Sequence, residues 1–205
     1  MIAFLHTNKA HIETFETLVR QHNPEIKTEH YVNKEILNNA LLSGKTDTHQ
    51  FTKEIEAIRK EKPSLIICTC STYGSESDKF TDVYRIDKPI IEYLVTNYSK
   101  IGLVYTANST KTVSEDLMLE IAAKQNKLIE VVYCDCSEYW SFFEAGNFES
   151  YEKGIAENIK QMASQVDVFF LAQASMAGAK KNLKSFEREV FTSPEYGIKT
   201  LLKKI

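Results

Sequence analysis

Glycine is scarce in this chain: seven glycines occur among 205 residues, and none lies in a phosphate-binding loop of the Walker or dinucleotide type. This scarcity argues against a nucleotide ligand. The basic residues are scattered and the formal net charge is −3, so the sequence offers no basic track for nucleic acid. No apolar stretch approaches the roughly 20 residues that cross a bilayer. We therefore expect neither a nucleic-acid partner nor a membrane span.

Cysteine is also rare, and the four thiols fall into two closely spaced pairs, Cys68 with Cys70 and Cys134 with Cys136. The apolar residues 2–5 are too few for a secretory signal, and no basic segment precedes them. We therefore expect a cytoplasmic protein with reduced thiols. Each pair has one intervening residue, whereas structural zinc sites usually have two or more between paired cysteines. The spacing therefore argues against a metal site.

Short apolar runs alternate with longer, charged segments of helical period. The runs span residues 2–6, 27–32, 64–70, 101–106, 128–134 and 167–173, and the helix candidates span 9–21, 48–61, 74–82, 91–98, 110–126, 148–164 and 194–204. Alternation of this kind predicts an α/β fold with parallel sheets and helices on their faces. The runs 64–68 and 167–171 are nearly continuous in apolar residues, which is typical of strands buried on both sides.

The two halves of the chain carry the same pair of strand signatures at nearly the same spacing. Residues 2–7 resemble residues 101–106, and residues 64–72 resemble residues 167–175. We therefore expect two similar α/β lobes related by a pseudo-twofold axis. The predicted lobes are residues 1–97 completed by the C-terminal helix 194–205, and residues 98–193.

Ligands of parallel α/β sheets lie beyond the carboxyl ends of the strands. Four residues stand at such ends, namely Thr7, Cys70, Thr106 and Gln173. If the lobes face each other, these residues converge on one cleft between them, which is the predicted active site. Cys70 and Gln173 occupy matching positions but differ in chemistry, because a thiol transfers a proton or attacks carbon whereas an amide only forms hydrogen bonds.

Cys70 is the strongest catalytic candidate, because it follows a buried strand and leads into a predicted helix. The positive end of that helix and its free N–H groups favour a thiolate, so we expect the pKa of Cys70 to lie below its ordinary value of about 8.5. The N–H groups and hydroxyls of Ser71 and Thr72 are suited to hold a carboxylate or an enediolate oxyanion. Cys68 lies inside the strand and is interpreted as a core residue.

Other polar side chains near strand ends are candidate substrate ligands. Ser175 is the counterpart of Thr72 as a donor, with helix capping as the alternative. Gln173 either orients a polar group of the substrate or fills space. His6 is interpreted as a hydrogen-bonded core residue, and a role as general acid or base is the less favoured alternative. Thr106, Ser109 and Thr110 are also predicted substrate ligands, with plain helix capping as the alternative. Thr7 and Asn8 are predicted to make the matching contacts from the first lobe.

These motifs resemble those of the aspartate/glutamate racemase superfamily, which includes hydantoin racemases, maleate cis-trans isomerases and arylmalonate decarboxylases. Residues 69–72 (TCST) are similar to the first Cys-Asn-Thr motif of the superfamily. Residues 171–177 (LAQASMA) are similar to its second motif, Leu-Gly-Cys-Ala-Gly-Met-Ala. Residues 143–147 are similar to a glycine-containing turn common there. The resemblance covers nearly the whole chain and places Gln173 where the second motif has its cysteine.

The resemblance implies cofactor-independent chemistry on a small carboxylic acid. Racemases of this type use two thiols on opposite faces of the substrate α-carbon, and here only Cys70 matches. One thiol suffices to protonate an enolate left by decarboxylation, to add to an activated double bond, or to exchange an α-proton on one face. We expect an isomerase or lyase that acts through Cys70, with donors from Ser71, Thr72 and Ser175. A catalytically silent carboxylate-binding or sensor protein is the alternative, and a homodimer is the default assembly.

Overall fold

The computed structural model describes residues 1–205, which divide into two compact units. The first unit comprises Met1–Asp87 and Pro194–Ile205, and the second comprises Lys88–Ser193. The boundary therefore follows Asp87, whereas the sequence analysis placed it after residue 97. The difference is helix α5 (Lys88–Asn97), which packs against α6 (Asn108–Lys124) of the second unit.

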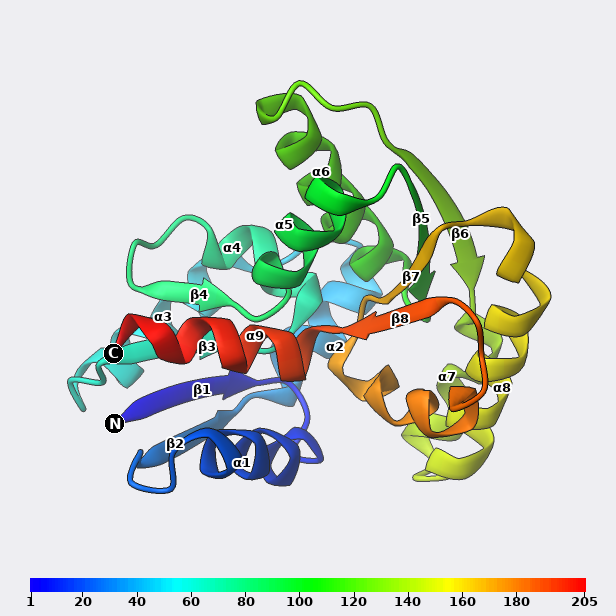
Figure 1. Ribbon diagram of the computed structural model, residues 1–205. Helices are drawn as coiled ribbons and strands as arrows, with labels where there is room; N and C mark the ends of the chain where they lie inside the picture. The colour runs from blue at the N-terminus through cyan, green and yellow to red at the C-terminus, as the bar shows by residue number, and fades with distance from the viewer. The chain divides into compact units, whose positions relative to one another are not determined.

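Strands and helices alternate in the first unit (Figure 1). Local signals fix several helix ends: the Asn33 side chain caps α2, the Asp47 side chain caps α3, and Gly44 ends α2 with a φ of 70°. The elements of this unit are β1 (Ile2–His6), α1 (His11–His22), β2 (Thr28–Val32), α2 (Lys34–Ser43), α3 (Thr48–Arg59), β3 (Leu65–Cys68), the short 3-10 helix η1 (Ser71–Tyr73), α4 (Gly74–Ser77), β4 (Val83–Arg85), α9 (Ser193–Leu201) and η5 (Leu202–Lys204).

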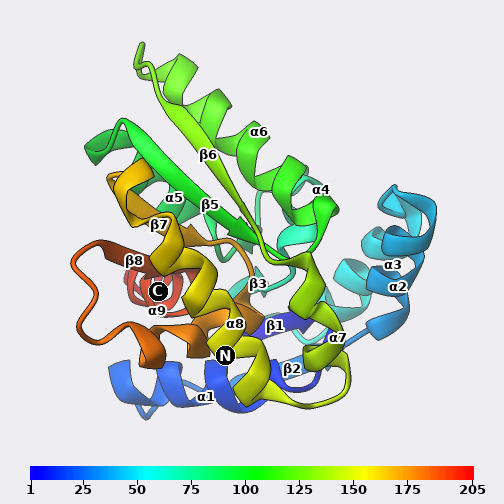
Figure 2. The same cartoon turned by 90° about the vertical axis from the view of Figure 1, so that its right-hand side faces the viewer.

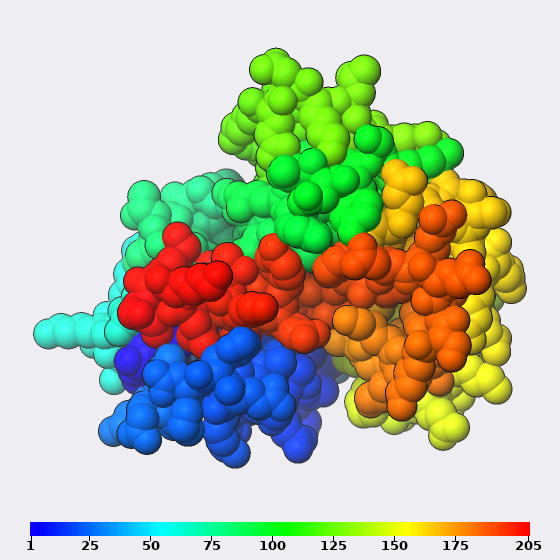
Figure 3. All heavy atoms as spheres, viewed as in Figure 1, coloured from blue at the N-terminus to red at the C-terminus, as the bar shows by residue number.

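The four strands of the first unit are parallel, in the order β2-β1-β3-β4. Side chains alternate between the two faces of the sheet. Ala3 and Leu5 pack in a core with residues of α2 and α3, whereas Phe4 contacts Phe15 of α1 on the other face, with ring centroids 5.5 Å apart. Within this unit α9 lies beside α1, as Figures 1 and 3 show. Both faces of the sheet are therefore buried, which explains the nearly continuous apolar strands.

The second unit has the same plan. Its strands are parallel in the order β6-β5-β7-β8, and Figure 2 shows α6 running along β5 and β6. The opposite face is covered by α8, whose buried residues Tyr151, Ile155 and Ile159 join the core. Besides α5 and α6, its elements are β5 (Lys100–Tyr105), β6 (Glu130–Asp135), η2 (Ser137–Tyr139), α7 (Trp140–Glu144), α8 (Phe148–Gln161), η3 (Ala163–Gln165), β7 (Val168–Leu171), η4 (Ala174–Leu183) and β8 (Glu189–Thr192).

The two sheets also share their register. Leu5 of β1 pairs with Cys68 of β3. Val104 of β5 pairs with Leu171 of β7 at the matching position. The internal repeat seen in the sequence is therefore a repeat of topology and pairing. Two residues beyond these pairs, the equivalent positions are Thr7 with Thr106 and Cys70 with Gln173.

The sequence analysis predicted no helix at α2, α7 or η4 and no strand at β4 or β8. The two strands are short edge strands of three and four residues. The helix predicted over 74–82 ends at Ser77, because the chain turns there toward β4. No helix of the structure has the length and apolar character needed to cross a membrane.

Candidate active site

The sulfur of Cys70 lies at the carboxyl edge of the first sheet among hydrogen-bond donors. The side chains of Thr7 and Thr72 and the backbone N–H groups of Thr72 and Tyr73 form hydrogen bonds with it. Cys70 is 8% exposed. The parallel pairing of β1 with β3 explains why Thr7 reaches this sulfur. We refer to Thr7, Cys70, Ser71 and Thr72 as the thiol cluster.

Burial raises the pKa of Cys70, and the hydrogen bonds from Thr7, Tyr73 and Thr72 only oppose this shift. The prediction of a lowered pKa was therefore wrong. The sulfur is shielded from water, and the helices that follow it have three and four residues, too few to build a strong macrodipole. Cys70 is thus a thiol at neutral pH, surrounded by donors that stabilise a thiolate once the proton has left.

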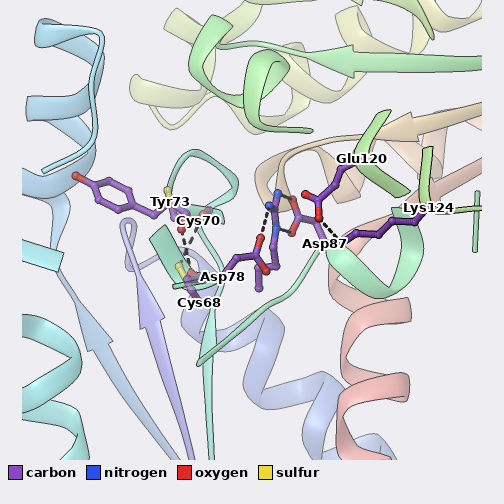
Figure 4. A network of polar contacts seen from close by, with 9 residues as sticks. Cys68, Cys70, Tyr73, Asp78, Asp87, Glu120 and Lys124 are labelled. Atoms are coloured by element: carbon purple, nitrogen blue, oxygen red, sulfur yellow. Dashed lines mark hydrogen bonds and ion pairs between the residues drawn. The ribbon is translucent and has the colours of Figure 1, made fainter. Parts of the chain in front are cut away.

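Tyr73 holds the loop that carries Cys70 against the body of the first unit. Its hydroxyl donates to the carbonyl of Ile36 at 2.9 Å and accepts from the N–H of Asp47 at 3.2 Å. Its ring stacks on Phe51, with centroids 5.2 Å apart. Figure 4 shows the ring pointing away from Cys70, so Tyr73 contributes its backbone to the thiol cluster and its side chain to the core.

A buried ion pair lies behind the same loop. Arg85 donates two hydrogen bonds to Asp87, at 2.7 and 2.8 Å, and a third to Asp78 at 3.1 Å. Figure 4 labels Asp78 and Asp87, the two carboxylates of this network. The guanidinium passes so close to Gly74 that any side chain at that position would collide with it. Because position 74 is a glycine, the guanidinium of Arg85 can pack directly against the backbone of the loop.

The equivalent edge of the second unit carries an amide in place of the thiol. The Oε1 atom of Gln173 accepts from the N–H of Thr106 at 2.7 Å and from its hydroxyl at 2.9 Å. Because a backbone N–H only donates, these contacts fix which end of the amide is oxygen. The NH2 group of Gln173 is thus the end that points away from the contacts with Thr106.

Tyr151 is a site residue that the sequence analysis missed. Its hydroxyl lies 3.0 Å from the hydroxyl of Ser175. Burial raises the pKa of Tyr151 to about 12, with Ser175 and Thr106 opposing the shift by hydrogen bonding. A signal existed: Asn147 caps α8 as Asp47 caps α3, and Tyr151 follows its cap as Phe51 follows the other. We refer to Thr106, Tyr151, Gln173 and Ser175 as the amide cluster.

No protein-family model matches this chain, and no curated protein matches it in sequence. Solved structures do match. The aspartate racemase of Picrophilus torridus superposes with a TM-score of 0.78 at 16% identity, over 98% of this chain and 92% of that chain. The glutamate racemase of Francisella tularensis subsp. tularensis SCHU S4, in complex with D-glutamate, gives 0.74 at 14%, over 98% and 79%. The allantoin racemase of Klebsiella pneumoniae gives 0.66 at 12%, over 98% and 86%.

This chain has the racemase fold. The finding confirms the fold that the sequence resemblance implied, two parallel α/β units of like topology. At such low identity the superposition establishes the architecture, and the chemistry has to be argued from the residues of this chain.

The remaining predicted ligands take varied places in the racemase fold. Ser71 is buried in η1 directly after Cys70. The side-chain oxygen of Asn8 accepts from the N–H of Ala10 at 2.9 Å and shapes the turn before α1. Ser109 and Thr110 lie in the first turn of α6, and Thr110 is buried. Binding of substrate by these side chains stays a prediction.

His6 is a hydrogen-bonded core residue. Its Nδ1 lies 2.8 Å from the Thr69 hydroxyl, and its Nε2 lies 2.9 Å from Nδ1 of His30. The Thr69 hydroxyl donates to the Leu5 carbonyl at 3.3 Å, so Nδ1 of His6 carries the proton that the hydroxyl accepts. Burial lowers the pKa of His6 to about 3 and that of His11 to about 4. Both rings are therefore neutral at pH 7.

The other cysteines are buried and free. The sulfurs of Cys134 and Cys136 lie 3.9 Å apart in the second unit. Burial raises the pKa of Cys68 to about 12, in keeping with a core thiol. The structure brings no three histidine, cysteine, aspartate or glutamate side chains into a group suited to a metal ion.

Proposed function

We propose that this chain is a cofactor-independent isomerase or lyase that acts on a small carboxylic acid through Cys70, with hydrogen bonds from the thiol cluster to the substrate. The convergence of donors on the Cys70 sulfur is the observation that carries the proposal. Structural neighbours of the racemase type support a function of the same broad kind. Their identities of 16% and 12% leave the substrate open.

The raised pKa of Cys70 favours reactions in which this residue starts as a thiol. In a decarboxylation, the bond between the carboxylate and the α-carbon breaks, CO2 leaves, and the electron pair remains as an enolate. The S–H bond of Cys70 then breaks and its proton goes to carbon. The hydroxyls of Thr7 and Thr72 and the N–H groups of Thr72 and Tyr73 stabilise the resulting thiolate, which regains a proton from water.

The amide cluster supports chemistry with one acid–base group. Gln173 has no proton to exchange at neutral pH, and Tyr151 is a neutral phenol whose pKa is raised to about 12. We assign these side chains no proton transfer, and the acid–base step to Cys70. Two-base racemisation needs an acid–base group on each face of the α-carbon, and Gln173 does not provide one at the position that matches Cys70.

The proposal is tested by proton NMR in D2O with aspartate, glutamate, a hydantoin, maleate and a substituted malonate. Wild type, Cys70→Ala and Cys68→Ala are compared, since both variants remove a buried thiol and the two positions lie two residues apart. We expect deuterium exchange, isomerisation or CO2 loss with wild type and Cys68→Ala, and none with Cys70→Ala. A folded Cys70→Ala protein that keeps its turnover would refute the proposal.

A catalytically silent carboxylate-binding protein on the same scaffold is the second candidate. The observation that favours it is the pairing of a thiol whose pKa is raised with an amide at the matching position. Such a protein would bind members of the NMR panel, shown by line broadening, without changing any of them. Turnover of any member that depends on Cys70 would exclude it.

A further inference from the structure

The two Cys-X-Cys pairs of the chain have the same spacing, but their sulfur atoms take different positions. The sulfurs of Cys134 and Cys136 lie 3.9 Å apart. In the first unit, the sulfur of Cys68 donates to the backbone carbonyl of Cys70 at 3.8 Å, and threonine hydroxyls of the thiol cluster bond with the sulfur of Cys70. The second unit therefore brings two thiols into contact with each other, whereas the first directs each thiol to a different partner.

The backbone at the end of β6 explains this contact. Cys134 lies in β6, and the N–H of Cys136 donates to the carbonyl of Tyr105 at 2.8 Å, which continues the pairing with β5 beyond the end of the strand. Residues two apart along such a backbone point to the same face of a sheet. Both side chains join the core that α8 covers. The pairing of β5 with β6 thus holds the two thiols side by side.

Asn158 of α8 provides a polar partner for one of the two sulfurs. Its Nδ2 atom donates to the sulfur of Cys136 at 3.6 Å and to the carbonyl of Asp135 at 3.3 Å. The hydroxyl of Tyr139 donates to its Oδ1 atom at 3.3 Å, which fixes the orientation of the amide. The sulfur of Cys136 therefore contacts the Asn158 amide and the Cys134 thiol.

The two thiols differ in acidity. A hydrogen bond from the Cys136 thiol lowers the pKa of Cys134, in opposition to burial. The same hydrogen bond and burial raise the pKa of Cys136. Cys134 is therefore the more acidic of the two, and the thiolate is the form of cysteine that reacts with oxidants.

Both thiols are buried, with 1% exposure for Cys134 and 0% for Cys136. Their cover is thin, because β6 is an edge strand, Asp135 between them is exposed, and η2 directly after them has no buried residue. A reagent of about the size of water needs only a small local opening to reach them. A bulky reagent such as glutathione disulfide needs a larger one.

We infer that Cys134 and Cys136 form a redox-active dithiol that a small peroxide oxidises to an intramolecular disulfide. Closure requires the sulfurs to approach by about 1.9 Å, from their contact distance of 3.9 Å to the length of a disulfide bond. The inference goes beyond the proposed function and does not depend on it, because both thiols lie in the second unit and Cys70 lies in the first.

The reaction proceeds in two balanced steps. The Cys134 thiol loses its proton, the thiolate attacks one oxygen of hydrogen peroxide, the O–O bond breaks, and hydroxide leaves to form water with that proton. Cys134 is then a sulfenic acid. Cys136 loses its proton and attacks the sulfenic sulfur, the S–O bond breaks, and hydroxide leaves to form a second water. Two thiols are oxidised to one disulfide, and one peroxide is reduced to two waters.

Mass spectrometry of tryptic peptides tests the inference on the wild-type protein. Each cysteine pair falls within one peptide, residues 61–79 or residues 128–153, because trypsin cleaves after lysine and arginine but not before proline. The folded protein is treated with hydrogen peroxide for increasing times, unfolded in iodoacetamide and digested. A disulfide leaves its peptide two hydrogen atoms lighter than the reduced peptide and without alkyl groups. We expect peptide 128–153 to close about tenfold or more faster than peptide 61–79, although Cys70 is the most exposed cysteine.

The protein unfolded in urea is the control, since both pairs then have the same spacing and no fixed geometry. The two peptides should close at similar rates there. In the folded protein, closure of peptide 128–153 no faster than that of peptide 61–79, or its oxidation to a sulfinic acid without closure, would overturn the inference. A tenfold difference in urea as well would also overturn it, because the fold would then not be the cause.

Asn158→Leu tests the polar partner of the dithiol. We expect closure to slow about fivefold, which corresponds to the loss of one hydrogen bond to the Cys136 thiolate as it attacks. Asn97→Leu removes an exposed amide that donates to the carbonyl of Tyr93 on α5, and it should leave the rate unchanged. An unchanged rate in Asn158→Leu, or an equal fall in both variants, would refute the role assigned to Asn158.

Discussion

The thiol cluster and the amide cluster are built on the same backbone plan and differ in what they present to a ligand. In each unit, a threonine that follows one central strand forms a hydrogen bond with the residue two positions after the end of the neighbouring central strand. Thr7, after β1, contacts Cys70, after β3, and Thr106, after β5, contacts Gln173, after β7. The first contact is made with a thiol, a group with a proton to release. The second fixes the orientation of an amide, which releases none at neutral pH. A repeated fold thus carries unequal chemistry through a change at one matched position.

The support beneath the clusters differs as well. Arg85 pairs with Cys68 in the ladder between β3 and β4, and Thr192 takes the matching place opposite Leu171 in the second sheet. The first unit therefore has a buried ion-pair network at Arg85, behind the loop that carries Cys70. The second unit has only Thr192 at the matching position.

Arg85→Thr would place in the first unit the residue type that the second unit has at the matching position, Thr192. Among the substitutions predicted to destabilise the fold, it should have the largest effect on the free energy of unfolding. We expect a loss of about 3–5 kcal/mol in the free energy of unfolding, because Asp87 would stay buried without its partner. Urea denaturation measures it. Arg59→Thr breaks the exposed pair with Asp82 and should cost less than about 1 kcal/mol. Similar small losses in both variants would show that the buried pair does not hold the loop.

His6, which is matched by Tyr105 in the second unit, should make the first unit acid-sensitive. Its folded pKa of about 3 lies below its ordinary value of 6.5, so the folded state disfavours protonation. Stability is complete above pH 6.5 and falls as the pH drops toward 3, by on the order of 3 kcal/mol at pH 4. His11 adds to this loss and His30 acts in the same direction, while Glu16 and Glu29 oppose the shift of His30.

Urea denaturation at pH 7 and pH 4 measures this effect. His6→Gln should lose less stability than wild type between the two pH values, whereas His49→Gln, at an exposed position of α3, should behave like wild type. The same acid loss in His6→Gln as in wild type would contradict the assignment to His6.

Gln173→Cys removes the difference between the two clusters. A second thiol at the matched position should raise exchange of the substrate α-proton by about 10²-fold, the usual contribution of a placed acid–base group. NMR in D2O measures the exchange on whichever panel compound wild type converts. Gln173→Ala is the control, and an equal rise in that variant would mean that loss of the amide, not gain of a thiol, is responsible.

Tyr151→Phe makes α8 match α3, where Phe51 stands. We expect a loss of about 1–2 kcal/mol in the free energy of unfolding and a less fixed Ser175 side chain, because the hydrogen bonds with Ser175 and Thr106 disappear while the ring stays. Tyr139→Phe serves as the control. It removes a hydroxyl that donates to Asn158, which lies on α8 like Tyr151. Only Tyr151→Phe should raise the KM of the substrate, and an equal change in both would contradict the assignment.

The central strands and their equivalence were readable from the sequence because a buried parallel strand needs a continuous apolar run. The edge strands were not: β4 and β8 are short, and β8 begins with an exposed Glu189. The repeat placed Cys70 and Gln173 at matching positions, and the structure agrees.

The electrostatics of the site were beyond the sequence. Burial decides the pKa of Cys70, and burial depends on how distant segments pack around the sulfur. Tyr151 was missed for a similar reason, since its contact with Ser175 joins α8 to the loop after β7. Local spacing does not report such contacts.

The most direct test of unequal roles is to measure kcat and KM for Cys70→Ala and Gln173→Ala on the compound that wild type converts. The account predicts that Cys70→Ala lowers kcat by about 10²-fold or more, because the acid–base group is lost. It predicts that Gln173→Ala raises KM by about tenfold with kcat nearly unchanged, because only binding is lost. A kcat loss in Gln173→Ala as large as that in Cys70→Ala would contradict the account.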